Sequence, residues 1–460
     1  MKEKFAILGA ALIIIGSFLV PETGALSLTG IRTFALVVAF IVLLISNALP
    51  LSITCWCVLA LMPVIGVTAG IGGALAGFTN PVLFFILASF GISAAFITTP
   101  LSRRILIFLL KRFGKSIKSM LFAFMLCILP MTAFLSSVPV AAMFLAIALN
   151  FLELYESDEE KKATGKTLMI AIPVTCLFGG IATPTGSAMN LLAINLLEEH
   201  AGYTISFVQW MSVGIPLVLL IFPVAWLLIY KIYKPAEIDP QMVRIFIEKL
   251  EVPAKIDVKE TKVLVIFGIM IALWVLSSWI SEINIVNVAI LGTCAMFFPY
   301  IRVLEWKSFI KNVNFDAFFL VGTVLSLGIV MVNNGVADWI TSMLPVNQMP
   351  LPALIAFTAT LVFVVLLFLP VGPSVIAFLA LPLITLSQSM GYSPALLILT
   401  LAFAASNCYL LPLDTIPLIT YSADYYSMLD MPKSTLPLQL FVIVAMTLVL
   451  WVAGALLNFI

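Results

Sequence analysis

Apolar runs long enough to cross a lipid bilayer recur along this chain from residue 5 to residue 459. About 20 consecutive apolar residues span the hydrocarbon, and a helix is the fold that satisfies their backbone internally. With 63% hydrophobic and 10% charged residues among 460, a soluble core could not hide this much apolar surface. The sequence therefore predicts an all-α polytopic membrane protein without a separate soluble domain.

Two of the apolar segments are interrupted at matching places in the two halves of the chain. The first break, 179–190, reads Gly-Gly-Ile-Ala-Thr-Pro-Thr-Gly-Ser-Ala-Met-Asn, and the second, 406–417, reads Ser-Asn-Cys-Tyr-Leu-Leu-Pro-Leu-Asp-Thr-Ile-Pro. Such breaks leave backbone polar groups unpaired at membrane depth, which is tolerated only where they are buried in protein or line a cavity. Two matched broken helices are typical of secondary transporters.

We predict about eleven transmembrane helices and two re-entrant hairpins. The hairpins, 119–152 and 353–390, have a polar or Pro/Gly centre at Ser136–Pro139 and at Pro370–Ser374. Counting a hairpin as two full spans would keep the same topology. The predicted spans are 5–21, 27–47, 50–68, 81–99, 167–197, 206–230, 262–280, 284–300, 315–333, 392–422 and 434–459.

The distribution of charge supports this topology. Of 23 basic residues, only Arg32 falls on the outer side, which is a strong positive-inside bias. We therefore expect an integral protein of the cytoplasmic (inner or plasma) membrane with its N-terminus inside and its C-terminus outside. The start, Met1–Phe5, enters a span without an evident cleavage site, so we expect an uncleaved first helix. The net charge of +1 argues against nucleic acid as a partner.

An internal repeat predicts two halves of nearly equal length. The first, 1–230, contains the hairpin 119–152 and the broken helix 167–197, and the second, 262–460, contains the hairpin 353–390 and the broken helix 392–422. A cytoplasmic linker, 231–261, joins them. Because the hairpins enter from opposite sides, the repeats have inverted topology, and a pseudo-twofold axis would bring both tips and both breaks together near the midplane.

The hairpin tips and breaks carry recognisable motifs. The first tip reads Ser136-Ser137-Val138, and the second reads Gly372-Pro373-Ser374, or Val371-Gly372-Pro373 if shifted by one. The breaks contain Gly186-Ser-Ala-Met-Asn190 and Asp414-Thr-Ile-Pro-Leu418. This arrangement resembles the divalent anion/sodium symporter family of sodium-coupled dicarboxylate, citrate and sulfate transporters. In that family the hairpin tips read Ser-Asn-Thr, and the breaks read like Gly-Thr-Pro-Pro-Asn or Ala-Thr-Pro-Pro-Asn.

The resemblance implies that these motifs hold a substrate and a coupling ion. The candidate substrate-binding residues are Ser136, Ser137, Val138, Thr185, Ser187, Asn190, Ser374, Thr415 and Pro417. The candidate residues of a sodium or proton site are Ser136, Ser137, Gly186, Asn190, Ser374 and Asp414. Sodium prefers oxygen ligands, which carbonyls and hydroxyls of the breaks could supply. With no Lys or Arg in the site, anion binding would rest on these hydroxyls and on half-helix N-termini.

Asp414 admits two interpretations. An ionised carboxylate in the middle of a span costs about 2.5 to 3.5 kcal/mol on insertion scales, so a cation or a proton must offset it. Asp414 could then coordinate the coupling cation or carry a proton. Alternatively, its carboxylate could cap the second half-helix by accepting a hydrogen bond from the free amide of Ile416 or of Leu418, the residue after Pro417. Both roles can hold together.

The resemblance implies a homodimeric secondary active transporter with an elevator mechanism, embedded in lipid. The expected substrate is a small organic anion, such as succinate or a related dicarboxylate, coupled to sodium with no other cofactor. A proton-coupled or exchanging transporter of a related anion that uses Asp414 is the alternative. An ion channel fits less well, because hairpins and broken helices suit an occluded site. Enzymatic chemistry would need a cluster of reactive side chains, whereas the membrane interior offers one clear carboxylate.

Two segments with many charged residues face the cytoplasm in this topology. Residues 101–118 alternate apolar and basic side chains and predict an amphipathic helix in the membrane interface, or else a connecting loop. Residues 231–261 are mixed in charge and predict a solvated linker.

Overall fold

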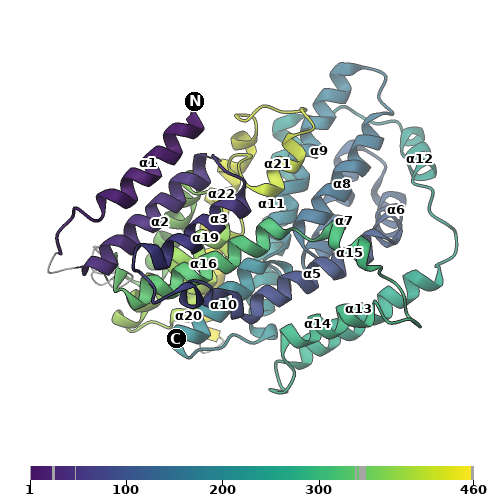
Figure 1. Cartoon of the computed structure of the whole chain (residues 1–460). Helices are drawn as coiled ribbons and strands as arrows, with labels where there is room; N and C mark the ends of the chain where they lie inside the picture. Colours follow the sequence, from purple (N-terminus) through teal and green to yellow (C-terminus); the bar gives the residue numbers. More distant parts are fainter. Residues whose placement is uncertain (1, 23–25, 47, 337–338, 341–348, 457–460) are drawn as a thin grey trace.

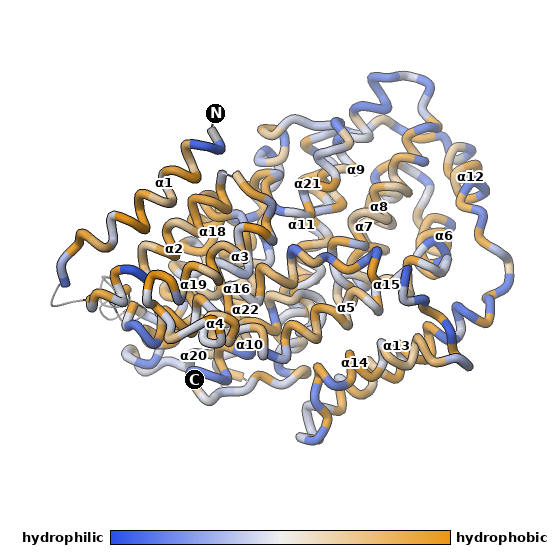
Figure 2. The backbone as a smooth tube through the Cα atoms, viewed as in Figure 1, coloured by the Kyte–Doolittle hydropathy of each residue, from blue (hydrophilic) through white to orange (hydrophobic). Residues whose placement is uncertain are grey.

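The computed structural model describes the whole chain except residues 1, 23–25, 47, 337–338, 341–348 and 457–460. The regular elements of the described part are helices (Figure 1). Six of them are long and apolar enough to cross a membrane, and a bent pair can add a seventh span. Figure 2 shows hydrophobic residues along the helices and hydrophilic ones gathered at the connections between them. The prediction of an all-α polytopic membrane protein is confirmed.

The first half of the chain follows the predicted order of spans, hairpin, broken helix and span. Its α-helices and 3₁₀-helices (η) are α1 (Lys2–Gly16), α2 (Leu28–Ser46), α3 (Leu51–Val64), α4 (Ile71–Ala74), η1 (Ala76–Thr79), α5 (Pro81–Ile97), α6 (Leu101–Phe113), α7 (Ile117–Thr132), α8 (Ser137–Leu152), α9 (Asp158–Gly179), η2 (Pro184–Gly186), α10 (Ala188–Ala201) and α11 (Phe207–Tyr233).

The second half repeats this order after a connecting helix. Its helices are α12 (Pro240–Lys249), α13 (Val258–Leu276), α14 (Ile285–Ala295), α15 (Trp306–Asn312), α16 (Phe315–Asn333), α18 (Leu351–Phe368), α19 (Gly372–Ser389), α20 (Pro394–Ala405), α21 (Thr415–Tyr421) and α22 (Met431–Leu456). The end of the last predicted span, 457–459, lies outside the described residues.

One predicted span is much shorter than its apolar run. The run 284–300 contains α14, whose 11 residues rise about 16 Å, roughly half the thickness of the hydrocarbon. Asn284 caps its first turn, because its side chain accepts hydrogen bonds from Val286 N–H and Asn287 N–H. The helix stops after Ala295, where the backbone enters successive turns. Hydropathy alone did not reveal this end.

Both predicted hairpins are pairs of helices joined by short turns. In the first hairpin, α7 and α8 are separated by residues 133–136, and in the second, α18 and α19 are separated by residues 369–371. The α8 helix packs against α9 and α21, whereas α19 packs against α20 and α10. Each hairpin therefore contacts the broken helices of both halves.

Both predicted broken helices are present. The first consists of α9 and α10, with the short η2 between them, and the second consists of α20 and α21, separated by residues 406–414. Pro184 at the start of η2 and Pro412 in the second gap lack a backbone N–H and so remove one hydrogen bond each from a helical ladder. Proline alone does not end a helix here, because α11 runs through Pro216 and Pro223 without interruption, and each break also contains further turn-forming residues.

The two charged cytoplasmic segments differ from their predictions in detail. The helix in 101–118 ends at Phe113, and the residues from Ile117 onward belong to the first hairpin. This helix, α6, turns away from α5 by 60° and buries Leu106 and Leu110. The linker 231–261 is not simply solvated, because it contains α12, whose Phe246 packs edge-on against Phe151 of the first hairpin.

An ion pair fastens the linker to α6. Arg104 Nε lies 2.5 Å from Glu260 Oε2, and the same guanidinium donates hydrogen bonds to the carbonyls of Pro253 and Lys255, both at 2.6 Å. The hydrogen bond from Arg104 holds the pKa of the Glu260 carboxyl below its usual range. The connection between the two halves is thus bonded to the bend that follows α5.

A second polar network surrounds Asp430 at the start of α22. Its carboxylate lies 3.0 Å from Lys166 Nζ of α9 and 2.8 Å from Lys433 Nζ, and Ser427 also donates to it. The hydroxyl of Tyr233 donates to the Asp430 carbonyl at 2.8 Å. Burial alone would raise the pKa of Asp430, but the hydrogen bonds from Lys433, Ser427 and Lys166 prevail and hold it well below its usual range.

We expect Asp430→Asn to lower the stability of the detergent-solubilised protein by about 1 to 3 kcal/mol at pH 7, since charge-assisted hydrogen bonds are lost. Because the folded-state pKa of Asp430 is lowered, this stabilisation is complete above the unfolded value of about 3.9 and declines as the pH falls further. Thermal unfolding from pH 7 to below pH 4 measures it, with the exposed Asp424→Asn as the control. Equal melting temperatures for both variants at pH 7 would contradict the role of this network.

Candidate functional site

Asn190 holds the first break together from inside. Its side chain is fully buried, and its Nδ2 donates hydrogen bonds to the backbone carbonyls of Gly180 and Thr183, both at 2.9 Å. These carbonyls belong to the stretch between α9 and α10, where the α-helical ladder is interrupted. The amide therefore supplies hydrogen-bond partners that lipid cannot offer.

The same amide joins the first break to the second. Asn190 Oδ1 accepts a hydrogen bond from Ser406 Oγ at 3.4 Å, and Ser406 directly follows α20. The helices α10 and α20 also pack against each other. Two interruptions that are 216 residues apart in the chain thus meet in the protein interior.

Gly186 lies where the tip of the first hairpin meets the first break. A Cβ atom added at Gly186 would collide with the backbone oxygens of Gly180, Ala133 and Thr132. The hydroxyl of Thr183 also donates to the carbonyl of Ala133, which ties the break to the tip. The absence of a side chain at Gly186 permits this close approach. Carbonyl oxygens therefore converge on one point, and such oxygens are the ligands of a hard cation.

The remaining hydroxyls of the first break surround the same region. Thr185 is buried, with its Oγ1 at 3.1 Å from Thr183 Oγ1. Ser187 is the N-cap of α10, and its side chain accepts a hydrogen bond from Met189 N–H at 3.2 Å. Our site prediction included Thr185 and Ser187 but not Thr183. The Thr-Pro-Thr repeat within the break is the signal that could have identified Thr183.

The first hairpin tip makes contacts on two sides. The backbone N–H of Ser136 donates to Ser93 Oγ of α5 at 3.0 Å. Ser137 Oγ donates to the carbonyl of Cys176 in α9 at 3.2 Å. Val138, the next residue, lines a large cleft. The tip is thus held between α5 and the first broken helix.

Two residues of the second hairpin tip, Gly372 and Ser374, lie in different environments. A Cβ atom at Gly372 would meet the sulfur of Met189 and the carbonyl oxygen of Ala405, so this position lies against the end of α20 and the start of α10. Ser374 instead faces α2 and α16 across a cavity of 20 Å³, and its buried Oγ has no hydrogen-bond partner among the described residues. The structure therefore brings Gly372, rather than Ser374, to the breaks.

Asn407 and Tyr409 are buried polar residues of the second break that the site prediction left out. Asn407 Nδ2 donates to the carbonyl of Phe403 at 2.6 Å, whereas Asn407 Oδ1 and the Tyr409 hydroxyl have no partner among the described residues. Unpaired buried polar atoms are rare and mark positions where a ligand or an ion can bind. The signal was present in the sequence, since Asn407 is the single side-chain amide of 392–422.

Asp414 caps α21, as the capping interpretation predicts. Its Oδ1 accepts a hydrogen bond from Ile416 N–H at 3.1 Å. Thr415 is exposed, and Pro417 is buried, with its carbonyl accepting hydrogen bonds from the hydroxyl of Thr420 in α21 and from that of Tyr426 in the loop after it. Because α21 packs against α8 and α9, these residues lie beside the first hairpin. Among the described residues, no hydrogen bond joins Asp414 to Asn190.

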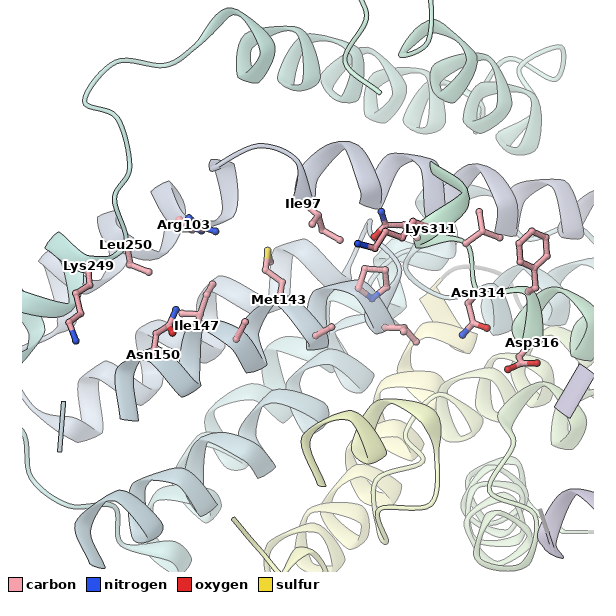
Figure 3. A pocket seen from close by; sticks show the side chains of 17 residues that line it. Ile97, Arg103, Met143, Ile147, Asn150, Lys249, Leu250, Lys311, Asn314 and Asp316 are labelled. Carbon is pink, nitrogen blue, oxygen red and sulfur yellow. The ribbon is translucent and has the colours of Figure 1, made fainter. Parts of the chain in front are cut away.

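A cleft of 780 Å³ runs along α8 to the tip of the first hairpin (Figure 3). It is bounded by the α5–α6 bend, by the end of α12 and by the connection from α15 to α16, and Val138 and Pro139 line its inner part. The second hairpin, in contrast, packs closely on α2 and α16, where the cavity measures 20 Å³. The first hairpin is therefore accessible along the cleft, whereas the second is closely packed.

The polar atoms at the two breaks are mostly neutral oxygens and N–H groups. The described residues contain no group of three or more His, Cys, Asp and Glu side chains that could hold a metal ion. The oxygen atoms at the breaks come from carbonyls, hydroxyls and amides, with the Asp414 carboxylate beside the first hairpin. Neutral oxygens and N–H groups of this kind suit a weakly held cation and an anionic solute.

Known proteins match this chain over nearly its whole length. The family model described as the sodium:sulfate symporter transmembrane region matches residues 2–459. A sodium-dependent dicarboxylate transporter of Staphylococcus saprophyticus is 25% identical over 439 residues, covering 89% of this chain and 83% of its own. The corresponding transporter of Staphylococcus aureus is 24% identical, and the alignment covers 81% of this chain and 76% of that protein. An uncharacterized transporter of Methanocaldococcus jannaschii is 27% identical, and the alignment covers 68% of this chain and 69% of that protein.

We expect Asn190→Ala to destabilise the protein by about 2 to 5 kcal/mol, because two buried carbonyls lose their donor. Ser406→Ala removes one long hydrogen bond and should cost less than about 1 kcal/mol. The double variant should cost no more than Asn190→Ala alone, since both changes remove the same contact. Denaturation in detergent measures all three, with the exposed Asn150→Ala as the control. A cost for Asn190→Ala no larger than that of Asn150→Ala would contradict this account of the break.

Proposed function

Because the chain belongs to the sodium:sulfate symporter family, we propose that it is a secondary active transporter that moves a small organic anion together with sodium. The preferred substrate is a dicarboxylate such as succinate, since the similar staphylococcal proteins are named sodium-dependent dicarboxylate transporters. The observation that carries the proposal is the meeting of the two breaks at Asn190 and Ser406. Matched interruptions facing each other in the interior provide the unpaired polar groups that a solute site needs.

The sodium site of this proposal lies at the contact between the first tip and the first break. The carbonyl oxygens around Gly186 and the hydroxyl of Thr183 supply hard ligands without a net charge. Ser136, Ser137 and Asn190 border this region from the hairpin and from α10. Since several of these oxygens already accept hydrogen bonds, sodium would bind with a small rearrangement of the tip.

The anion site of this proposal lies between the breaks. The N-terminus of α10 at Ser187 supplies free N–H groups, and Thr185, Ser406 and Asn407 supply polar side chains. These groups are uncharged, so they favour an anion without binding it too tightly for release. Of the other predicted contacts, Val138 borders the cleft, whereas Ser374, Thr415 and Pro417 lie further from this meeting point and would act through the hairpin and α21.

Transport in this proposal is a movement of the hairpins and broken helices, with α11 and α22, against the remaining helices, as in an elevator. The two sequence halves would form inverted repeats, which the matching contacts of the two hairpins support. The cleft separates these two groups of helices on the side that carries α6 and α12, which the charge distribution places in the cytoplasm. A homodimer is part of the same proposal, and native mass spectrometry from detergent measures it.

Labelled succinate uptake into proteoliposomes tests the function. An inward sodium gradient should drive accumulation above equilibrium, whereas a potassium gradient of the same size should not. A proton gradient and an exchange condition with internal succinate are run beside it. Uptake driven only by protons or by internal substrate would overturn sodium coupling and favour the alternative in which Asp414 carries the proton. An absence of uptake for succinate, citrate and sulfate alike would overturn the anion-transport proposal.

Asp414→Asn separates the two roles of this side chain. Asparagine also caps helices well, so the hydrogen bond from Ile416 N–H and the thermal stability should persist within about 0.5 kcal/mol. If the carboxylate takes part in coupling, binding of succinate survives while the sodium or pH dependence of uptake changes. Asp414→Ala, which loses the cap as well, serves as the comparison. Unchanged ion dependence in Asp414→Asn would restrict Asp414 to capping.

A further inference from the structure

Three basic side chains line the cleft, and none of them forms an ion pair within the part of the chain that the structure describes. They are Arg103 at the start of α6, Lys249 at the end of α12 and Lys311 of α15. The ion pairs among the described residues involve other side chains, namely Arg104, Lys166 and Lys433. All three side chains are exposed, and they come from both halves of the chain and from the linker between them.

The one acidic residue that lines the cleft does not neutralise these cations. The Asp316 carboxylate accepts hydrogen bonds from the backbone N–H of Ser52 at 3.2 Å and from its hydroxyl, so it is held toward α3. Figure 3 shows Lys249, Arg103 and Asn150 toward one end of the cleft and Lys311, Asn314 and Asp316 toward the other. The described side chains that line the cleft therefore carry a net positive charge, three cations against one carboxylate.

The cleft leads to the first hairpin. Its lining passes from Asn150 through Ala146 and Met143 to Val138 and Pro139 at the tip, on one face of α8. A solute that moves along this face from Asn150 passes Lys249 and Arg103 before it reaches the tip, whose own described residues are uncharged. Lys311 lies toward the other end of the cleft (Figure 3). Low-dielectric walls lined by one sign of charge raise the local concentration of the opposite ion.

We infer that Arg103, Lys249 and Lys311 form an anion-collecting station in this cleft, where a carboxylate-bearing solute is held transiently between the bulk solution and the hairpin tip. That the solute is the transported anion rests on the proposed function. The positive potential itself does not, because it follows from charges and cavity shape alone. Its two consequences, electrostatic and kinetic, are therefore measured separately.

The electrostatic test uses a cysteine inside the cleft. Ala146→Cys is placed in a background where Cys57 and Cys294, which are not buried, are serine. The rates of labelling with an anionic and with a cationic methanethiosulfonate are compared in detergent. Replacing the three cleft residues (Arg103→Gln, Lys249→Gln and Lys311→Gln) should lower the anionic-to-cationic rate ratio about tenfold. Salt at about 1 M should remove most of the difference.

A matched control keeps the same helices and the same loss of charge. Lys111, Arg244 and Lys307 are exposed basic residues of α6, α12 and α15 that do not line the cleft. The variant that changes these three to glutamine should alter the rate ratio less than about twofold, because solvent screens distant charges. Equal effects of the two triple variants would overturn the proposed anion-collecting role of the three cleft residues. This holds whether or not the protein transports succinate.

The kinetic test uses succinate efflux and uptake in oriented proteoliposomes. The cleft triple variant should raise the apparent KM for succinate presented from the cleft side about three- to tenfold, with kcat and the KM from the opposite side unchanged. The control triple variant should behave as the parent. If labelling confirms the positive potential while the succinate KM is unchanged from both sides, the station does not serve the transported anion, and that part of the inference is overturned.

Discussion

The structure depends on one constraint, which is that backbone groups left unpaired by a broken helix must find partners inside the protein. Asn190 meets this requirement for the first break, since its amide nitrogen donates hydrogen bonds to the carbonyls of Gly180 and Thr183. Its amide oxygen accepts a hydrogen bond from the Ser406 hydroxyl of the second break. The Asn190 amide thus links the two breaks directly, in addition to the packing of α10 against α20. The carbonyls of the first break are therefore satisfied within the protein, whereas Asn407 Oδ1 and the Tyr409 hydroxyl of the second break have no partner among the described residues.

The hairpins pack against the broken helices that this constraint organises. Each is a pair of helices joined by a short turn, and it packs on the broken helix of its own half and on the second segment of the broken helix of the other half. Gly186 allows the first tip to reach the break closely, and Gly372 lies at the corresponding approach of the second tip. The two hairpins differ in their outer surroundings, because the first borders a cleft of 780 Å³ whereas the second is packed against α2 and α16. This difference defines which side of the molecule is open.

Much of this architecture was predictable, because hydropathy and prolines mark spans, hairpins and breaks directly. The family resemblance, based on the motifs at Ser136 and Gly186, was confirmed by the match over residues 2–459. Side-chain environments were less predictable. Ser374 was grouped with the site by motif position but faces α2, while Thr183, Ser406 and Asn407 were omitted although they lie in the breaks. Register within a tip and the end of a short helix such as α14 depend on tertiary packing, which one sequence does not reveal.

The central claim is that substrate and sodium bind where the first hairpin tip meets the breaks, and accessibility at the tip tests it most directly. Val138→Cys, in a background with serine at positions 57 and 294, is labelled with a neutral thiol reagent with and without sodium and succinate. Ala146→Cys, further along the same cleft, is the comparison. The account predicts that sodium and succinate together slow labelling at Val138→Cys and leave Ala146→Cys unchanged. Equal labelling of Val138→Cys in all conditions, in a protein that transports succinate, would contradict it.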